Sequence, residues 1–183
     1  MKQKSLFVVT LLFCVLSLVS CSSKLNESKI RTILKDNLTS EDLNTSVALE
    51  IGDVSFVSNS EIEHFKILEE EGLLIVKKNS QRSYNVSLTD KANPYLVETI
   101  EKKIGIFGGI SLFAKMKAFT YEVNAIEDIH ENPSENTATA RVTLKKVDKT
   151  PFAILLKDNT DFLKKKLKFF KTTEGEWKLL RNE

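Results

Sequence analysis

The chain contains the sequence Leu73-Leu74-Ile75-Val76-Lys77-Lys78, followed by Asn79-Ser80-Gln81 and by Arg82-Ser83-Tyr84-Asn85-Val86-Ser87-Leu88. A short apolar run that ends in a polar turn is typical of a buried strand. The alternation of apolar and polar residues after the turn is typical of a strand with one solvated face. These residues therefore predict a β-hairpin, and the elements on either side of it decide the fold class.

A helix is expected immediately before the hairpin. Ser60 and Glu63 have the three-residue spacing of a capping box, and Gly72 is a natural left-handed stop. After the hairpin, Thr89-Asp90 caps a further segment, Lys91 to Lys103, with Pro94 near its start. The expected order is helix, hairpin and capped segment.

Residues Ser60 to Tyr95 resemble the helix and wing of a winged-helix domain, because a helix ending in Glu-Gly-Leu-Leu is followed by a hairpin and then by Leu-Thr-Asp-Lys. The resemblance implies a helix that enters a DNA groove. Carboxylates at that place would repel phosphate. The helix carries five of them: Glu61, Glu63, Glu69, Glu70 and Glu71. We therefore expect the winged-helix architecture without DNA binding.

Two further elements are expected before this region. An amphipathic helix is predicted near the N-terminus, with Asn26 or Ser28 as its cap. Its apolar face is formed by Ile30, Ile33, Leu34 and Leu38. From Thr45 to Phe56 the apolar period changes to two, which predicts a strand that is interrupted or bulged at Gly52-Asp53.

The segment Ile104 to Ala114 is uncharged and contains three glycines, which disfavour a regular helix. We interpret it as a buried connector, in which Phe107 and Phe113 lose most of their exposure on folding. The alternative is a hydrophobic lip that binds a partner or ligand, with the same two phenylalanines as contacts.

The remaining sequence is rich in strand patterns. Four strands with mostly short turns are expected at residues 118–129, 137–147, 162–171 and 176–180. The predicted fold class is α+β, with N-terminal helices and a wing-like hairpin before a C-terminal antiparallel curled sheet of about four strands. The predicted regions are a signal peptide (1–20), a short tether (21–24), a helical and wing-like region (25–103), the connector (104–114) and the β-rich region (115–183).

Lysines are concentrated in the third of these strands. Lys164, Lys166 and Lys168 share one face, while Leu167 and Phe169 point inward. A neighbouring stretch adds three more basic residues: Lys145, Lys146 and Lys149. A solvated edge that discourages unwanted strand pairing explains this pattern. The alternative is contact with anionic headgroups or with an acidic partner.

Composition limits the class of partner. The chain has 27 Lys and Arg against 25 Asp and Glu. Lys2 and Lys4 lie in the predicted signal peptide, so the mature part carries equal numbers of both signs. This balance argues against nucleic acid as a partner. Of the two cysteines, Cys14 lies in the predicted signal peptide, which leaves Cys21, the first residue after it, as a single cysteine. No disulfide or cysteine nucleophile is therefore expected in the mature domain.

The N-terminal segment predicts where the protein is located. Lys2 and Lys4 precede an apolar run, Leu6 to Leu18, that is shorter than the about 20 residues needed to cross a bilayer. The run ends in Leu18-Val19-Ser20-Cys21, which resembles the lipobox of bacterial lipoproteins. The resemblance implies that Cys21 receives a diacylglycerol thioether and becomes the mature N-terminus. In some bacterial lipoproteins an aspartate directly after the lipidated cysteine holds the protein in the inner membrane. This chain has Ser22 at that position, so the resemblance favours the outer membrane.

No catalytic motif is found in the sequence. His64 and His130 lie in different halves without ligand spacing, so we expect no metal and no cofactor. The predicted function is a non-enzymatic binding or assembly module of the cell envelope, held on the membrane by Cys21, with an envelope protein as its partner. The alternative is an envelope enzyme whose catalytic residues are scattered along the sequence.

Overall fold

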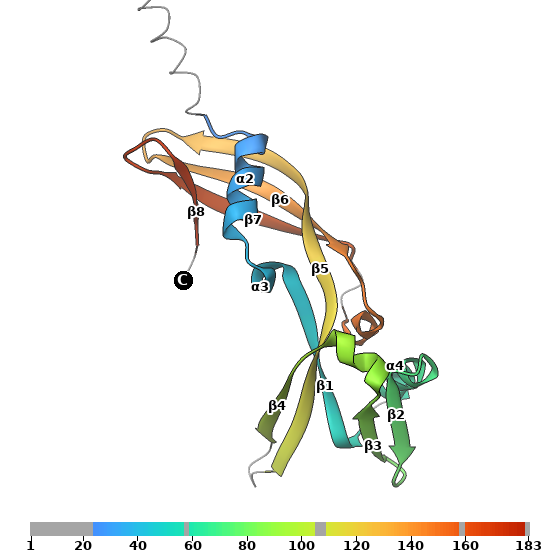
Figure 1. Cartoon of the computed structure of the whole chain (residues 1–183). Helices are drawn as coiled ribbons and strands as arrows, with labels where there is room; N and C mark the ends of the chain where they lie inside the picture. The colour runs from blue at the N-terminus through green and yellow to red at the C-terminus, as the bar shows by residue number, and fades with distance from the viewer. Residues whose placement is uncertain (1–23, 57–58, 105–108, 158–159, 182–183) are drawn as a thin grey trace, which may run out of the picture. The chain divides into compact units, whose positions relative to one another are not determined.

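The computed structural model describes residues 24–56, 59–104, 109–157 and 160–181 (Figure 1). In these residues eight strands form one antiparallel sheet in the order β2-β3-β1-β5-β6-β7-β8, with β4 also paired to β5. The chain divides into two compact units: residues 1–38, 123–143 and 164–183 form unit 1, and residues 39–122 and 144–163 form unit 2. We describe each unit by itself.

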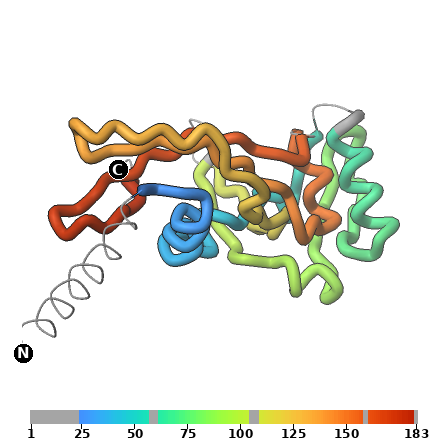
Figure 2. Tube along the Cα trace, turned by 90° about the horizontal axis from the view of Figure 1, so that it is seen from above, coloured from blue at the N-terminus to red at the C-terminus, as the bar shows by residue number. Residues whose placement is uncertain are grey.

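In the part of unit 1 that the structure describes, one helix packs with four antiparallel strand segments. The helix is α2 (Glu27–Asn37). The segments come from β5 (Gly109–Asn132), β6 (Thr137–Val147), β7 (Phe162–Lys171) and β8 (Trp177–Leu180). α2 lies beside β8 in both views of the backbone (Figures 1 and 2).

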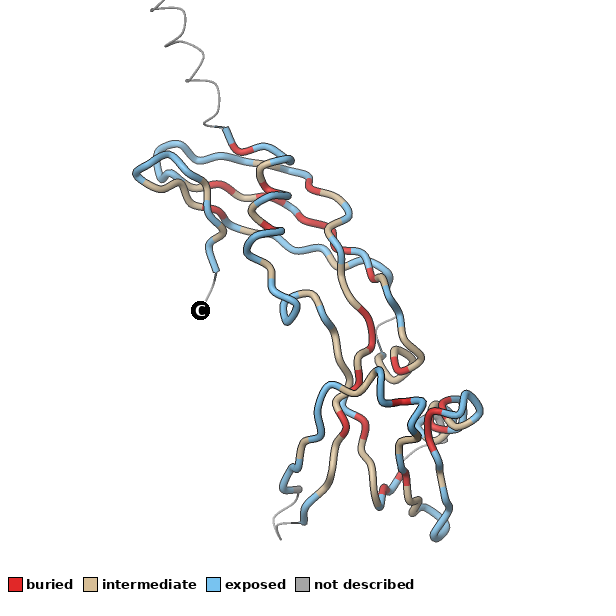
Figure 3. The backbone as a smooth tube through the Cα atoms, in the orientation of Figure 1, coloured by how far each residue is buried: buried red, intermediate tan, exposed pale blue. Residues whose placement is uncertain are grey.

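The start of α2 is fixed by side-chain hydrogen bonds. Asn26 is its N-cap, as predicted, and its Oδ1 accepts a hydrogen bond from the Lys29 amide at 2.9 Å. The amide of the preceding Leu25 donates to Glu131 Oε1 at 2.6 Å, which ties the chain to β5. Ile30 and Leu34 are fully buried, so the predicted apolar face of the helix packs inward. In Figure 3 the buried positions of α2 lie between exposed ones, as the amphipathic pattern requires.

Unit 2 contains the remaining elements. Its helices are α3 (Ser40–Leu43), α4 (Asn59–Glu70), η2 (Asp90–Tyr95) and η3 (Pro151–Leu155). Its strands include β1 (Asn44–Ser55), β2 (Leu74–Lys78), β3 (Ser83–Leu88) and β4 (Leu96–Ile104). One buried cluster holds them together: Leu49, Val54, Phe56, Phe65, Leu68, Leu73, Leu74, Val86, Ala92, Ala114, Met116 and Phe152.

The predicted hairpin and its flanking stop are confirmed. β2 and β3 pair antiparallel from Leu74↔Leu88 to Lys78↔Tyr84. Gly72 has a φ of 72°, and the Leu73 amide donates to the Leu68 carbonyl at 2.9 Å, which closes the end of the helix.

The strand predicted at Thr45 to Phe56 also forms, and Gly52 marks a change of partner. β1 pairs with β5 from Asn44 to Ile51 and with β3 from Gly52 to Ser55. Gly52 has a φ of 84°, a value that glycine adopts without the steric cost that a Cβ would bring. The predicted interruption of this strand is therefore the place where it leaves one neighbour for another.

The predicted α+β class is wrong, because the described chain is mostly strand and all eight strands belong to one sheet. The error lies largely in the region taken as helical and wing-like. The segment Lys91 to Lys103 is a short 3-10 turn followed by the nine-residue strand β4. Pro94 cannot continue a helix hydrogen-bond ladder, and the β-branched Val97, Thr99 and Ile100 favour an extended backbone.

The segment expected to form a connector also contributes strand residues. Gly109 to Ala114 open β5, and β4 pairs with them from Ile104↔Gly109 to Thr99↔Ala114. These residues are therefore part of an antiparallel pair. Phe107 lies outside the described residues.

Candidate functional site

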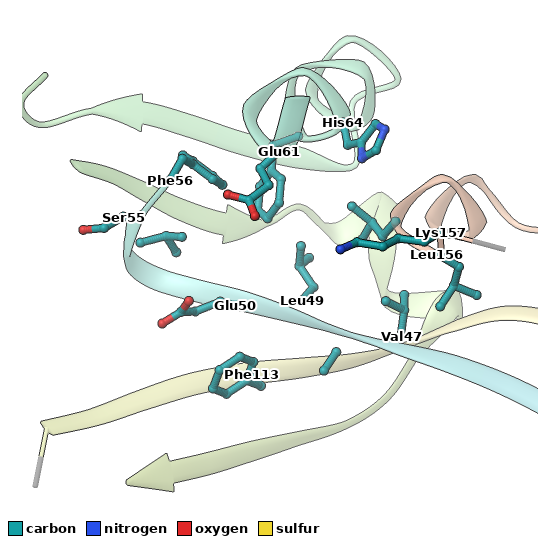
Figure 4. Close-up of a pocket in the computed structure, with 14 residues that line it drawn as sticks. Val47, Leu49, Glu50, Ser55, Phe56, Glu61, His64, Phe113, Leu156 and Lys157 are labelled. Atoms are coloured by element: carbon teal, nitrogen blue, oxygen red, sulfur yellow. The ribbon is translucent and has the colours of Figure 1, made fainter. Parts of the chain in front are cut away.

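A cavity of about 510 Å³ lies in unit 2 between β1, α4 and the segment that follows η3 (Figure 4). Ligand pockets generally fall between about 300 and 1,000 Å³ and are mostly apolar with a few polar groups. The lining residues are Val47, Ala48, Leu49, Glu50, Val54, Ser55, Phe56, Glu61, His64, Phe65, Phe113, Leu155, Leu156 and Lys157.

The apolar wall of this cavity belongs to the core of unit 2. Leu49, Val54, Phe56 and Phe65 are buried. The rings of Phe56 and Phe65 meet edge to face, with centroids 4.7 Å apart, and Phe56 makes a second edge contact with Tyr84 at 5.2 Å. This wall is therefore held by rigid aromatic contacts. The apolar surface that stays accessible to a ligand belongs to half-buried lining residues, among them Val47, Leu155 and Leu156.

Polar groups lie around the apolar wall. Figure 4 shows Glu61 of α4 and Lys157, which follows η3, reaching toward the cavity from different sides. His64 lies one helical turn after Glu61 on α4, since residues three apart share a helix face. Glu50 points to the opposite side of β1 from Leu49, as successive strand residues do. The cavity thus combines an apolar surface with groups of both charge signs.

The segment between β6 and β7 contains η3 and supplies Leu155, Leu156 and Lys157 to the cavity. It is held in place at both of its ends. The Thr150 amide donates to the Ala118 carbonyl at 2.8 Å, and the Thr150 hydroxyl donates to the Lys117 carbonyl at 2.5 Å. Phe152 in η3 is fully buried against Tyr95, with ring centroids 5.7 Å apart. A hydrogen bond also joins the beginning of this segment to its end, since Lys149 Nζ donates to Asp161 Oδ1 at 2.5 Å.

The ion pair between Lys149 and Asp161 should be visible in a titration. The hydrogen bond from Lys149, and then its charge, lowers the pKa of Asp161 below the ordinary value of 3.8. Because the folded-state pKa is lowered, the pair stabilises the fold above the unfolded-state pKa, and that contribution is lost as pH falls through the folded-state value. We expect carboxyl NMR to report a pKa for Asp161 that rises toward 3.8 in Lys149→Gln and moves less in Lys145→Gln. Equal pKa values in wild type and Lys149→Gln would contradict the pairing.

Phe113, one of the predicted contact residues, lies at the margin of the cavity. It is half-buried, and its register partners are Glu50 on β1 and Ile100 on β4. The Nζ of Lys102 lies 5.3 Å from the centroid of its ring, within cation–π range. Phe107 and Cys21, the other predicted apolar contact and the lipidation site, lie outside the described residues.

The predicted basic residues lie in other parts of the chain. Lys164, Lys166 and Lys168 are exposed on β7, in unit 1. Lys168 also lines a cavity of about 380 Å³ in that unit, together with His130. Lys146, which was expected to add to an exposed basic face, is only 7% exposed, and its Nζ lies 4.6 Å from the centroid of the Phe119 ring.

The two histidines are not brought together, because His64 belongs to unit 2 and His130 to unit 1. Across the residues that the structure describes, no group of three or more His, Cys, Asp or Glu side chains is arranged to hold a metal ion. In the same residues no helix has both the length and the apolar character needed to span a bilayer.

The cavity in unit 2 was not predicted from the sequence. Its walls come from a strand, a helix and a loop, and the loop is separated from the strand by about a hundred residues. The local patterns placed Phe56 at the end of its strand and predicted the helix that contains Phe65. They carried no sign that Leu155, Leu156 and Lys157 would lie opposite them.

Comparison of the chain with protein-family models, with curated proteins and with solved structures finds no match.

Proposed function

We propose that the protein is a non-enzymatic binding module of the bacterial cell envelope, anchored to the membrane by a lipid on Cys21. The observation that carries the proposal is the sequence Leu18-Val19-Ser20-Cys21 at the end of a short apolar run, in the order of a lipobox. One acyl chain binds a membrane only reversibly, whereas two hold it stably. A diacylglyceryl cysteine supplies two.

The cavity of unit 2 supports the binding part of the proposal. Packed residues such as Phe56 and Phe65 hold the apolar wall in place, so a ligand that enters does not have to order it. Half-buried Val47, Leu155 and Leu156 supply the apolar contact surface. Lys157 and Glu61 are placed to contact polar atoms of that ligand. We infer a ligand, or a segment of an envelope protein partner, that is largely apolar and has a polar end.

A fluorescent fatty acid tests the cavity. cis-Parinaric acid should bind the mature chain with a rise in its fluorescence, since its polyene chain moves from water to an apolar wall. Leu156→Glu should weaken binding by about tenfold or more, because the ligand would then cover an unpaired carboxylate. Ile75→Glu is the matched control, since Ile75 lies on β2, is 43% exposed and does not line the cavity. Equal affinities of the two variants, or no binding to wild type, would overturn a ligand role for this cavity.

One observation favours the alternative of an envelope enzyme, namely that Glu61 and His64 both line the cavity. A carboxylate and an imidazole are the groups most often used in general acid–base catalysis. The two functions differ in the fate of the bound compound. Mass spectrometry of a bound ligand after prolonged incubation should recover it unchanged if the module only binds. Its conversion, abolished in His64→Gln, would favour the enzyme.

A further inference from the structure

One face of the β7–β8 pair in unit 1 is both basic and uncovered. The register pairs Lys168 with Leu180 and Phe170 with Lys178, so these four side chains share a face, and the two-residue period adds Lys164 and Lys166 to it. The four lysines and Leu180 are exposed, and Phe170 is half-buried. We call this set the lysine face: Lys164, Lys166, Lys168, Phe170, Lys178 and Leu180.

The opposite face of the same pair is the one that packs in unit 1. Phe169 is fully buried, and its register partner Leu179 is half-buried. Trp177 lies on that side, where it borders a hollow together with Thr32 and Ile33 of α2. The helix therefore covers the side away from the lysine face, and the lysine face stays open to solvent.

The charge of the lysine face is not balanced within its own strands. Neither β7 nor β8 contains an acidic residue. Two carboxylates of unit 1, Glu131 and Glu135, lie at one end of the face, in the hollow that Lys168 and Leu180 also line. Lysines two residues apart on a strand lie about 7 Å from one another. Three of the lysines follow one another at this spacing on β7, and Lys178 lies on the neighbouring strand β8. Their like charges repel each other, so the face attracts an anionic surface. The half-buried ring of Phe170 and the 44% exposed Leu180 add apolar contact in the middle of this charge.

The N-terminal tether limits how far unit 1 can be from a bilayer. Only three residues separate Cys21 from Leu25, whose amide is bonded to Glu131 in unit 1. A fully extended chain spans at most about 3.6 Å per residue, so this tether reaches about 14 Å. A lipid on Cys21 would thus hold Leu25, where unit 1 begins to be bonded, within about two Debye lengths of the headgroups at physiological salt.

We propose that the lysine face is a second membrane contact, which binds the anionic phospholipid headgroups of the leaflet that holds the Cys21 anchor. This proposal rests on the proposed lipid anchoring, because the anchor is what brings the lysine face near that leaflet. The four lysines contact lipid phosphates, while Leu180 and Phe170 enter the boundary between headgroups and acyl chains. The lipid then fixes the protein on the membrane, and the lysine face sets which side of unit 1 lies on it.

Vesicle binding of the mature chain, residues 21–183 with Cys21→Ser, tests the proposal on a protein that has no lipid anchor of its own. We expect it to co-sediment with vesicles rich in phosphatidylglycerol and not with phosphatidylcholine vesicles, and to dissociate at high salt. A basic residue near an anionic surface contributes about fivefold in affinity. Replacing Lys164, Lys166, Lys168 and Lys178 together by glutamine should therefore weaken binding by at least about a hundredfold.

The matched control changes the net charge equally at exposed lysines of unit 2: Lys66, Lys77, Lys78 and Lys103. This control should lose less than about fivefold in affinity, the contribution of one contacting lysine. Equal losses of vesicle affinity in the two variants would show that only the net charge of the protein matters, and would overturn the proposal. Absence of vesicle binding would also overturn it and would favour an acidic protein as the occupant. Because the Cys21→Ser chain carries no acyl anchor, either result is independent of whether Cys21 is acylated in the native protein.

Discussion

Replacing Cys21 by serine is expected to move the protein from the membrane fraction to the soluble fraction, or to leave it as the unprocessed precursor. Serine has no thiol to form the thioether, so the mature chain would lack the acyl chains that hold it. Fractionation in about 1 M salt, where the Debye length is about 3 Å, separates this effect from the lysine face, since screening removes the headgroup contact and leaves a lipid anchor in place.

Ser22→Ala is the control for this experiment. It changes the neighbouring residue and keeps the cysteine, so the protein should remain processed and membrane-bound in high salt. A Cys21→Ser protein that is cleaved normally and stays on the membrane in high salt would refute lipid anchoring at this residue.

The second large effect is expected in the core of unit 2. Phe152 is fully buried in η3 and contacts Tyr95, so Phe152→Ala should lower the free energy of unfolding by about 3–5 kcal/mol. Denaturant unfolding of the purified mature chain measures the change. The loss should be accompanied by weaker binding in the cavity, because η3 positions Leu155 and Leu156 in its wall.

Phe113→Ala is the matched substitution for Phe152→Ala. The ring of Phe113 is half-buried and interacts with Lys102, so its removal should cost about 1 kcal/mol, near the average for point substitutions. Similar losses in the two variants would contradict the placement of Phe152 in the core and of Phe113 at the margin.

Local sequence patterns were sufficient to predict those elements whose hydrogen-bond partners are adjacent in the sequence. The hairpin of β2 and β3 needs only a short polar turn, and Gly72 ends α4 through bonds within a few residues. The apolar faces of these elements could also be predicted, because an element that is buried on one side repeats its apolar residues with the period of a helix or of a strand.

Partner choice among distant strands could not be predicted in the same way. The pattern at Gly52 marked an interruption of β1, but it gave no reason for pairing with β5 before that residue and with β3 after it. Four of the nine residues of β4 are charged, Glu98, Glu101, Lys102 and Lys103, and it becomes a strand through pairing with its neighbour β5. The cavity depends on these long-range pairings, and so it was missing from the prediction.

Mass spectrometry of the N-terminal peptide of the protein, purified from the membrane fraction of its host, tests lipid anchoring most directly. The account predicts that the peptide begins at Cys21 and carries the added mass of a diacylglycerol on the sulfur, commonly with an acyl chain on the nitrogen. An N-terminal peptide with an unmodified Cys21, or one that begins at another residue, would contradict it.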